Sequence, residues 1–206
     1  MSSHFDQLAQ TWDQDQMKVE RSKATAEQCR NVTLHENKNL LDVGGGTGLL
    51  SVHLRDCFES ITIADMSKEM LRVAQEKIDR AKITNIKTFA VKEDISEVPD
   101  TYSAMITLMT LHHIADLEGF ISSAAKILDD YGTLMIADIY QDDGSFHDHV
   151  ADFDGHDGFE VGALSKILEN ANFEVSSVNP YFEITKETQT GEMRSYPLFF
   201  LVARKR

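Results

Sequence analysis

The stretch "LLDVGGGTGLLS", residues 40–51, places four glycines within five positions directly after a short apolar run. That run carries one carboxylate, Asp42. Glycine is the residue that tolerates positive φ angles and lets a ligand approach the backbone closely. In α/β proteins a loop of this kind joins a strand to the following helix and lies beside the bound ligand. The stretch therefore predicts a strand, a ligand-binding loop and a helix, in that order.

The alternation that begins in this stretch continues to about residue 140. Apolar runs rich in Ile, Val, Leu and Thr predict strands at 39–43, 60–65, 86–91, 103–109 and 132–140. Between residues 67 and 82 the apolar side chains fall at helical spacing, and Ser67 is a suitable N-cap. Continuous apolar strands separated by helices predict a parallel sheet with both faces covered, which is a Rossmann-like doubly wound α/β fold.

The two ends of the chain depart from this alternation. The first 35 residues are expected to form two helices, with an apolar stripe made by Phe5, Leu8, Ala9 and Trp12. Residues 141–159 are polar, acidic and rich in His, which predicts a long loop. A helix and two strands follow, and they predict a C-terminal antiparallel hairpin with Pro197 at the start of its second strand.

These segments are expected to form one domain over residues 1–206, because 206 residues suffice for a single core. Within it we distinguish four parts. They are the N-terminal helices that cover the site (1–35), the ligand-binding core (38–140), the loop (141–159), and the C-terminal helix and hairpin (160–206).

Charge and cysteine content narrow the function. A formal net charge of −14 and a pI near 4.9 disfavour nucleic acid and anionic membranes as partners. Cys29 and Cys57 show no ligand spacing, which predicts reduced thiols in a cytoplasmic protein. The start "MSSHFDQLAQ" lacks the apolar segment of a signal peptide, and no apolar run is long enough to span a bilayer.

The glycine loop fits neither of the two common phosphate-binding patterns. The dinucleotide pattern G-x-G-x-x-G requires glycine where this chain has Leu49, and a phosphate loop requires Lys and Ser or Thr after its last glycine. The spacing is instead D-x-G-x-G-x-G. Asp65 ends the second predicted strand, where a carboxylate can accept both hydroxyls of a ribose. Asp94, after the third, is placed to accept from a base amine, so the ligand implied is a nucleoside without a required phosphate.

Five stretches, taken in chain order, resemble the successive motifs of class I S-adenosylmethionine-dependent methyltransferases. They are "LLDVGGGTGLLS", "ITIADMSKEML", "KEDI", "MITLMTLHHIAD" and "GTLMIADIY". The nearest resemblance is to small-molecule enzymes of the ubiquinone/menaquinone methyltransferase type. It covers residues 38–140 well and the C-terminal tail loosely. It implies a seven-stranded sheet that ends in a hairpin, with S-adenosyl-L-methionine as the cofactor and S-adenosyl-L-homocysteine as its product.

The resemblance also implies roles for nine positions around the cofactor. These are Asp42 at the amino group, Gly44, Gly46 and Gly48 beneath the methionine part, Asp65 at the ribose, Met66 against the adenine, Asp94 at its amine, Ile95 at a ring nitrogen through its backbone, and Leu108 at the sulfonium through its carbonyl. A sulfonium and an ammonium are both cationic, so they favour a site lined by carboxylates and carbonyls.

Methyl transfer depends mainly on aligning donor and acceptor and on excluding water. A carboxylate acceptor needs no general base, whereas a phenol, amine or carbon acid can need one. The candidates are His113, Tyr140, His147 and His149, and the sequence does not choose among them. The pair His112 and His113 is expected to have a structural role.

The loop 141–159 leaves the fifth predicted strand on the same side as the glycine loop, so we expect it to cover the acceptor pocket. Its His and Asp residues match no standard ligand spacing, and no metal is therefore expected. They are His147, His149, His156, Asp148, Asp152, Asp154 and Asp157. The sequence predicts a hydrated acidic loop here.

The function expected is methyl transfer to a small-molecule acceptor by a monomer or homodimer. Three alternatives stay open. One is a protein that binds S-adenosylmethionine or S-adenosylhomocysteine without turnover, and another is an NAD(P)-dependent oxidoreductase. The third, a nucleic-acid methyltransferase, is disfavoured because "LMTLHHI" stands where a D/N-P-P-Y/F motif belongs and neither cysteine follows a proline.

Overall fold

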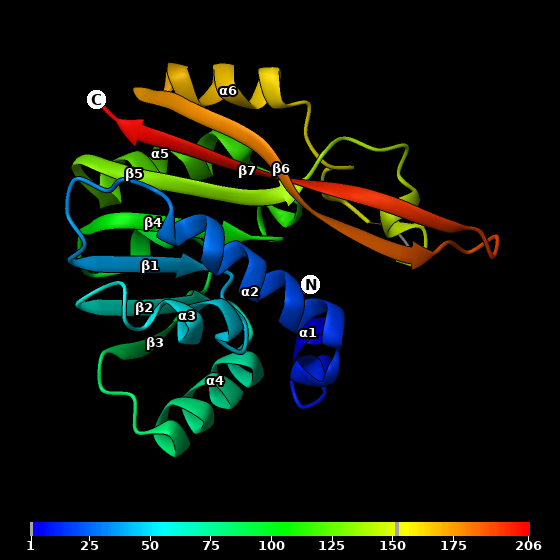
Figure 1. Ribbon diagram of the computed structural model, residues 1–206, viewed down its shortest axis with the longest axis horizontal. Helices are drawn as coiled ribbons and strands as arrows, with labels where there is room; N and C mark the ends of the chain where they lie inside the picture. Colours follow the sequence, from blue (N-terminus) through cyan, green and yellow to red (C-terminus); the bar gives the residue numbers. More distant parts are fainter. Residues whose placement is uncertain (1, 151–152) are drawn as a thin grey trace.

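The computed structural model describes residues 2–150 and 153–206; Asp152 of the predicted acidic loop lies outside the described residues. Its strands form a seven-stranded sheet in the order β3-β2-β1-β4-β5-β7-β6 (Figure 1). The strands are β1 Asn39–Val43, β2 Ser60–Asp65, β3 Ile86–Ala90, β4 Tyr102–Leu108, β5 Leu128–Ile139, β6 Phe173–Glu187 and β7 Met193–Lys205.

The direction of the strands follows the prediction. Strands β1 to β5 pair in parallel, and β7 pairs antiparallel with both β5 and β6. The predicted α/β class, a mostly parallel doubly wound sheet with a C-terminal antiparallel hairpin, is therefore confirmed. In Figure 1 the hairpin of β6 and β7 extends well beyond the end of β5.

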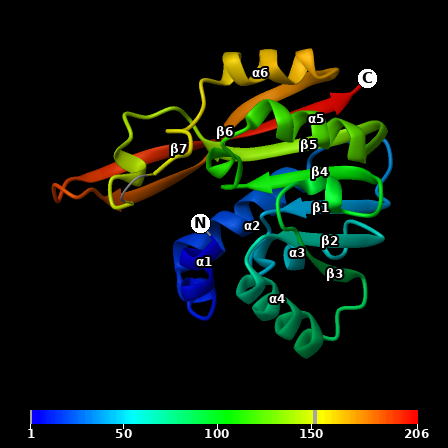
Figure 2. The ribbon, with the colours of Figure 1, turned by 180° about the vertical axis from the view of Figure 1, so that it is seen from behind.

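Helices cover both faces of the sheet, as Figures 1 and 2 show from opposite sides. One face packs against α2, α3 and α4, and the other packs against α5 and α6. The helices are α1 Ser2–Leu8, α2 Gln16–Arg30, α3 Leu49–Leu54, α4 Lys68–Ala81, α5 Leu117–Ile127 and α6 Val161–Asn170.

The two cores arise from the alternation of side chains along each strand. Leu40 of β1 and Ile106 of β4 belong to the core under α2, α3 and α4, whereas their neighbours Leu41 and Met105 belong to the core under α5 and α6. Successive residues of a strand point to opposite faces, so a strand that is apolar throughout feeds both cores. Each such side chain contributes about 1.5–3 kcal/mol when it is buried.

The helix that follows β2 begins and packs as its sequence predicts. The Ser67 hydroxyl accepts a hydrogen bond from Met70 N at 3.2 Å, which makes Ser67 the N-cap of α4. Met70, Leu71, Ala74 and Ile78 form its buried stripe. This start fixes the position of α4 directly after Asp65, the residue expected to contact the ribose.

The predicted helical stripe through Trp12 is wrong beyond Leu8. Helix α1 ends at Leu8, Trp12 begins a short 3-10 turn, and α2 starts at Gln16. The reason is Asp15, whose carboxylate accepts from Met17 N and Lys18 N and so caps a new helix. Trp12 still contacts Phe5, with ring centroids 5.8 Å apart.

The C-terminal hairpin is longer than expected, and Pro197 does not start its second strand. Strand β7 begins at Met193, and Pro197 pairs with Glu183 inside it. The carbonyl of Pro197 accepts from Tyr140 N, on the β5 side of β7. In a strand the N–H and C=O of one residue point to the same side. The missing N–H of Pro197 would therefore face β5, and its absence removes no hydrogen bond between β7 and β6.

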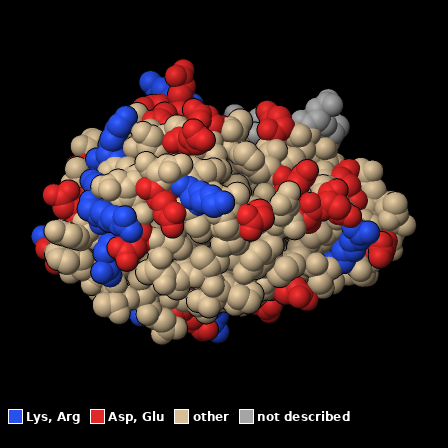
Figure 3. Space-filling view, turned by 90° about the horizontal axis from the view of Figure 1, so that it is seen from above, with Lys and Arg blue, Asp and Glu red and all other residues tan. Residues whose placement is uncertain are grey.

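Charged side chains are mixed on the face that Figure 3 shows, where Lys and Arg are interrupted by acidic and uncharged residues. This mixture accompanies a net charge of −14. Among the described residues, no helix is both long enough and apolar enough to span a membrane.

Candidate functional site

The glycine loop runs from the end of β1 to the start of α3 in a conformation that requires glycine. Gly44, Gly46 and Gly48 have φ angles of 66°, 54° and 75°. A Cβ atom on Gly44 would lie 2.3 Å from Thr110 Oγ1, and one on Gly48 would lie 2.7 Å from Ile63 Cδ1. The loop is therefore packed tightly between β2 and the turn after β4, where no side chain larger than that of glycine would fit at Gly44 or Gly48.

Asp65, at the end of β2, connects the glycine loop to the start of α4. Its Oδ2 accepts from Gly46 N at 2.9 Å and its Oδ1 accepts from Ser67 N at 2.8 Å. Burial raises the pKa of Asp65, and the two backbone donors oppose that rise. The next residue, Met66, is 55% exposed beside it. The sequence indicated a role for Asp65 toward a ligand but not this second role in holding the loop.

Asp42 lies beneath the same loop and is 1% exposed. Its Oδ2 accepts from Ser51 Oγ at 2.6 Å, and a Cβ atom on Gly45 would lie 2.8 Å from this carboxyl group. Burial raises the pKa of Asp42 to about 7, with a further rise from the charge of Asp65 and an opposing effect of the Ser51 hydrogen bond. A cation bound above the loop would favour the ionised form of Asp42.

Asp94 follows β3 and caps the 3-10 turn Ile95–Glu97. Its Oδ1 accepts from Ser96 N at 2.8 Å and from Ser123 Oγ at 3.2 Å. The side chain of Ile95 is buried against the core under α5. Since Asp94 Oδ2 is free of these two bonds, the residue retains acceptor capacity at the end of the sheet.

Leu108 ends β4 next to the glycine loop. The Thr110 hydroxyl is 3.2 Å from Leu108 O and 3.4 Å from Gly44 O. On the other side, Val91 N donates to Asp65 O at 3.0 Å, which places the ends of β2 and β3 together. The predicted cofactor residues therefore lie along one edge of the sheet, at the carboxyl ends of β1 to β4.

The N-terminal segment is bonded to this edge. Ser67 Oγ donates to Asp6 Oδ1 at 2.6 Å, and Thr47 Oγ1 donates to Asp13 Oδ1 at 2.6 Å. Lys77 Nζ forms an ion pair with Asp13 Oδ2 at 2.6 Å and donates to Thr47 O at 2.8 Å. Figure 1 shows α1 near the end toward which the β1 arrow points.

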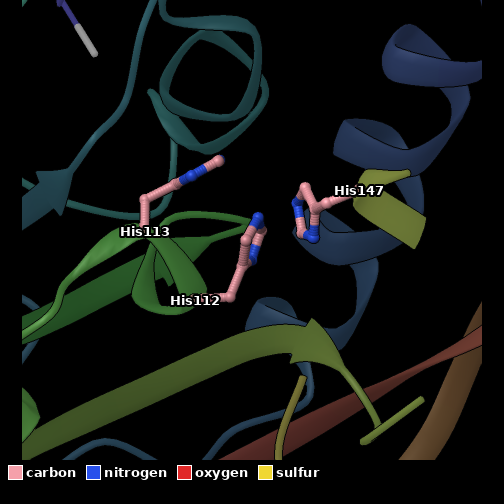
Figure 4. A group of neighbouring side chains, drawn as sticks. All are labelled: His112, His113 and His147. Carbon is pink, nitrogen blue, oxygen red and sulfur yellow. The ribbon is translucent and has the colours of Figure 1, made fainter. Parts of the chain in front are cut away.

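Three histidines converge farther along the same edge (Figure 4). His112 and His113 belong to the 3-10 turn after β4, and His147 belongs to the 3-10 turn Ser145–His147 of the predicted loop. The ring centroid of His112 lies 4.1 Å from that of His113 and 5.0 Å from that of His147. His147 is only 8% exposed. The expectation that this part of the loop is hydrated is therefore wrong for His147, because its ring packs against the β4 turn.

A buried carboxylate supports this cluster from β5. His112 Nδ1 donates to Asp138 Oδ1 at 2.6 Å, and His112 N donates to Asp138 Oδ2 at 3.3 Å. Asp138 is fully buried. Asp138 was not among the predicted site residues, although a single carboxylate inside the apolar run "LMIADIY" is a signal that could have identified it.

The four candidates for a general base separate into two groups. His113 and His147 lie together, and burial lowers the pKa of His113 to about 3 and that of His147 to about 4, so both are neutral at pH 7. Tyr140 packs on Phe199 and lines a separate groove of about 380 Å³. His149 is exposed and bonds to the Glu187 carbonyl at 2.9 Å.

Known methyltransferases are similar to this chain in sequence and in fold. A family model described as a methyltransferase domain matches residues 14–178. The chain is 26% identical over 155 residues to an uncharacterised methyltransferase of Schizosaccharomyces pombe, covering 68% of this chain and 55% of that protein. It is 26% identical over 104 residues to a ubiquinone biosynthesis O-methyltransferase of Rhizobium etli, covering 50% of this chain and 42% of that protein.

The chain thus spans about half the length of the curated relatives it matches. Among solved structures, it is similar to an S-adenosylmethionine-dependent methyltransferase from Aquifex aeolicus with a TM-score of 0.71 and 18% identity. That match covers 100% of this chain and 99% of the other. At this level of identity the likeness demonstrates a shared fold.

Proposed function

Because the chain belongs to the class I S-adenosylmethionine-dependent methyltransferase family, we propose that it transfers a methyl group from S-adenosyl-L-methionine to a small-molecule acceptor. The observation that carries this proposal is the glycine loop tied to Asp65, since Gly46 N and the Asp65 carboxylate meet at 2.9 Å beside a backbone free of side chains. The loop contains no Lys or Arg, which fits a cationic ligand.

The residues present suit this cofactor in backbone conformation and in charge. Positive φ angles at Gly44, Gly46 and Gly48 leave a surface on which the methionine part would rest. Asp42 supplies a negative charge under the loop for the ammonium group. Each oxygen of Asp65 already accepts one N–H, and a carboxylate oxygen has two lone pairs, so both retain capacity for the ribose hydroxyls.

Met66, Asp94, Ile95 and Leu108 complete the proposed contacts. The exposed Met66 side chain would lie against the adenine, Asp94 Oδ2 would accept from its amine, and the Ile95 backbone would meet a ring nitrogen. The Leu108 carbonyl would border the sulfonium, the group that supplies an activated methyl when the cofactor is bound. The chain's own contribution is to orient both partners and to exclude water.

The acceptor would lie between the N-terminal segment and the loop 141–159. His113, at this edge of the sheet, contacts Phe5 of α1 and His147 of the loop, with ring centroids 5.5 and 5.7 Å apart. His113 and His147 are therefore better placed to face an acceptor than Tyr140 or His149. Residues 1–35 were expected to cover the site, and we propose that α1 and the turn at Trp12 also form a lid over the cofactor.

Binding measurements test the identity of the cofactor. We expect isothermal titration calorimetry to give micromolar dissociation constants for S-adenosylmethionine and S-adenosylhomocysteine, because the glycine loop and the carboxylates around it suit a nucleoside with a cationic tail. NADH and NADPH should not bind, since the third glycine of the dinucleotide pattern is Leu49. Comparable affinity for NADH would contradict the proposal. Tight S-adenosylhomocysteine binding without transfer of labelled methyl to any of a broad panel of phenols, amines and acids would favour the binding protein instead.

The proposed lid gives a second expected result. Asp13→Ala removes the bonds to Thr47 and Lys77, so S-adenosylhomocysteine should dissociate several-fold faster. The expected loss is about 1 kcal/mol, because the pair is only partly buried. The single tryptophan, Trp12, reports dissociation by stopped-flow fluorescence.

Glu36→Ala is the matched control for this measurement. It breaks the exposed ion pair with Lys38, 2.7 Å long, away from the glycine loop. Its dissociation rate should equal that of the unaltered protein. If Asp13→Ala also leaves the dissociation rate unchanged, the N-terminal segment is not a lid over the cofactor.

A further inference from the structure

The histidine cluster, His112, His113 and His147, brings imidazole nitrogens together at a largely buried position. Ring nitrogens of His112, His113 and His147 lie within 4.8 Å of one another. Figure 4 shows the ring of His112 between those of His113 and His147. Among the residues that the structure describes, neither His113 Nδ1 nor His147 Nδ1 has a hydrogen-bond partner, although both atoms are buried. Buried polar atoms are nearly always paired, so these two point to a ligand.

We propose that His112, His113 and His147 bind one divalent transition-metal ion. The sequence predicted no metal, because the His and Asp residues of the loop match no standard ligand spacing. The three ligands proposed here come instead from two segments 34 residues apart. The donor set is three imidazoles without an oxygen ligand, which suits Zn²⁺, Fe²⁺, Co²⁺ or Ni²⁺ and not Mg²⁺ or Ca²⁺. Three protein ligands leave at least one coordination position open for water or another molecule.

The spacing of the three rings is close to that of a bound site. With metal–nitrogen bonds of about 2.0–2.1 Å, tetrahedral ligands lie about 3.4 Å apart. The rings therefore need to approach one another by at most about 1.4 Å. Rotation of the imidazoles and a small shift of the turn at His147 would suffice. That turn belongs to a loop, whereas His112 is held by the β4 turn and by Asp138.

Asp138 is placed as the outer partner of a metal-bound histidine. Because His112 Nδ1 donates to Asp138 Oδ1, Nε2 is the ring nitrogen that is left to bind a metal ion. Metal-ligating histidines commonly donate their other ring N–H to a carboxylate, which fixes the ring and raises its basicity. The carboxylate also supplies negative charge near a buried dication.

Nearby groups include one cation and two aromatic rings. Lys186 Nζ donates to the Phe146 carbonyl and lies 4.6 Å from the Phe146 ring centroid. Its positive charge opposes the binding of a cation beside His147. The His147 ring stacks on Phe153 with centroids 3.8 Å apart. Stacking accounts for the face of the His147 ring but not for its buried, unpaired edge. We therefore favour ligation over aromatic packing alone. Ligation does not depend on methyl transfer, and it would place the metal ion beside the proposed acceptor position.

Metal titration of the full chain tests the proposal. Protein stripped with a chelator should bind Zn²⁺ at one site by calorimetry and, with Co²⁺, show the visible absorption of a nitrogen-ligated ion. His147→Ala should weaken Zn²⁺ binding at least tenfold and change the Co²⁺ spectrum. Asp138→Asn should weaken it about ten- to a hundredfold while the site persists. His149→Ala, in the same loop but outside the cluster, should change neither.

A second variant, His113→Gln, shows whether a loss of Zn²⁺ binding comes from a lost ligand or from misfolding. Far-UV circular dichroism should establish that His147→Ala and His113→Gln are folded, and both should lose Zn²⁺ affinity. Equal Zn²⁺ affinity and an equal Co²⁺ spectrum in folded His147→Ala and His113→Gln would overturn the proposal, since any binding would then be at other residues. Failure of the stripped protein to bind either ion would overturn it as well and would leave the cluster as aromatic packing.

Discussion

Asp42→Asn should stabilise the ligand-free protein at pH 8 by roughly 2–4 kcal/mol and weaken its binding of S-adenosylhomocysteine about ten- to a hundredfold. Both effects have one cause. Asp42 is 1% exposed, and burial raises its pKa from 3.8 to about 7. At pH 8 the folded protein must therefore hold a buried charge, which asparagine removes while it still accepts from Ser51. The same substitution removes the negative charge that Asp42 would place beneath the ammonium group of the bound ligand, so binding weakens.

The dependence on pH identifies this cause. A carboxyl whose pKa is raised in the folded state stabilises the fold while it is protonated, and that contribution is lost as pH rises through the folded pKa. The difference in unfolding free energy between variant and unaltered protein should therefore be small near pH 4, grow between pH 4 and 7, and level off above. Urea denaturation at several pH values measures it.

Asp56→Asn is the control for this experiment, because Asp56 has the same chemistry on a side chain that is 83% exposed. It should change the unfolding free energy little at any pH. A difference for Asp42→Asn that is the same at pH 4 and pH 8 would mean that packing, and not the buried charge, accounts for it.

The features that the sequence predicts correctly are those set by local patterns. The Ser67 cap depends on residues within one helical turn, and the positive φ angles of the glycine loop depend on residue type. The sheet follows because apolar strands alternate with an amphipathic helix. The end of the first helix could not be read from periodicity alone, because the cap made by Asp15 competes with the stripe that leads to Trp12.

The histidine cluster shows where local patterns no longer suffice. His112 and His147 are separated by a helix, a strand and part of a loop, and they meet only because β4 and β5 are neighbours in the sheet. Asp138 carried the clearer signal, since an ionisable residue inside an apolar strand needs a partner. The sequence alone does not say which residue that partner is. The structure shows that it is His112.

Asp65→Ala should lower the affinity for S-adenosylhomocysteine about ten- to a hundredfold, through the loss of charge-assisted hydrogen bonds to the ribose. The fold should persist, because two effects on stability oppose one another. Removing Asp65 leaves Gly46 N and Ser67 N without their acceptor, but it also removes a carboxylate whose pKa is raised by burial. Calorimetry of the binding, together with urea denaturation, separates affinity from stability.

Asp65→Asn distinguishes the two roles of this residue. Asparagine keeps one oxygen to accept from Gly46 N or Ser67 N but carries no charge, so it should preserve more loop order than alanine and recover little affinity. Asp79→Ala on the exposed side of α4 removes the same charge away from the loop and should leave binding unchanged. If Asp65→Asn binds S-adenosylhomocysteine as tightly as the unaltered protein, the carboxylate serves the loop alone, and the ribose must be held by another residue. If both Asp65 variants lose affinity in proportion to their loss of stability, the effect on binding is indirect.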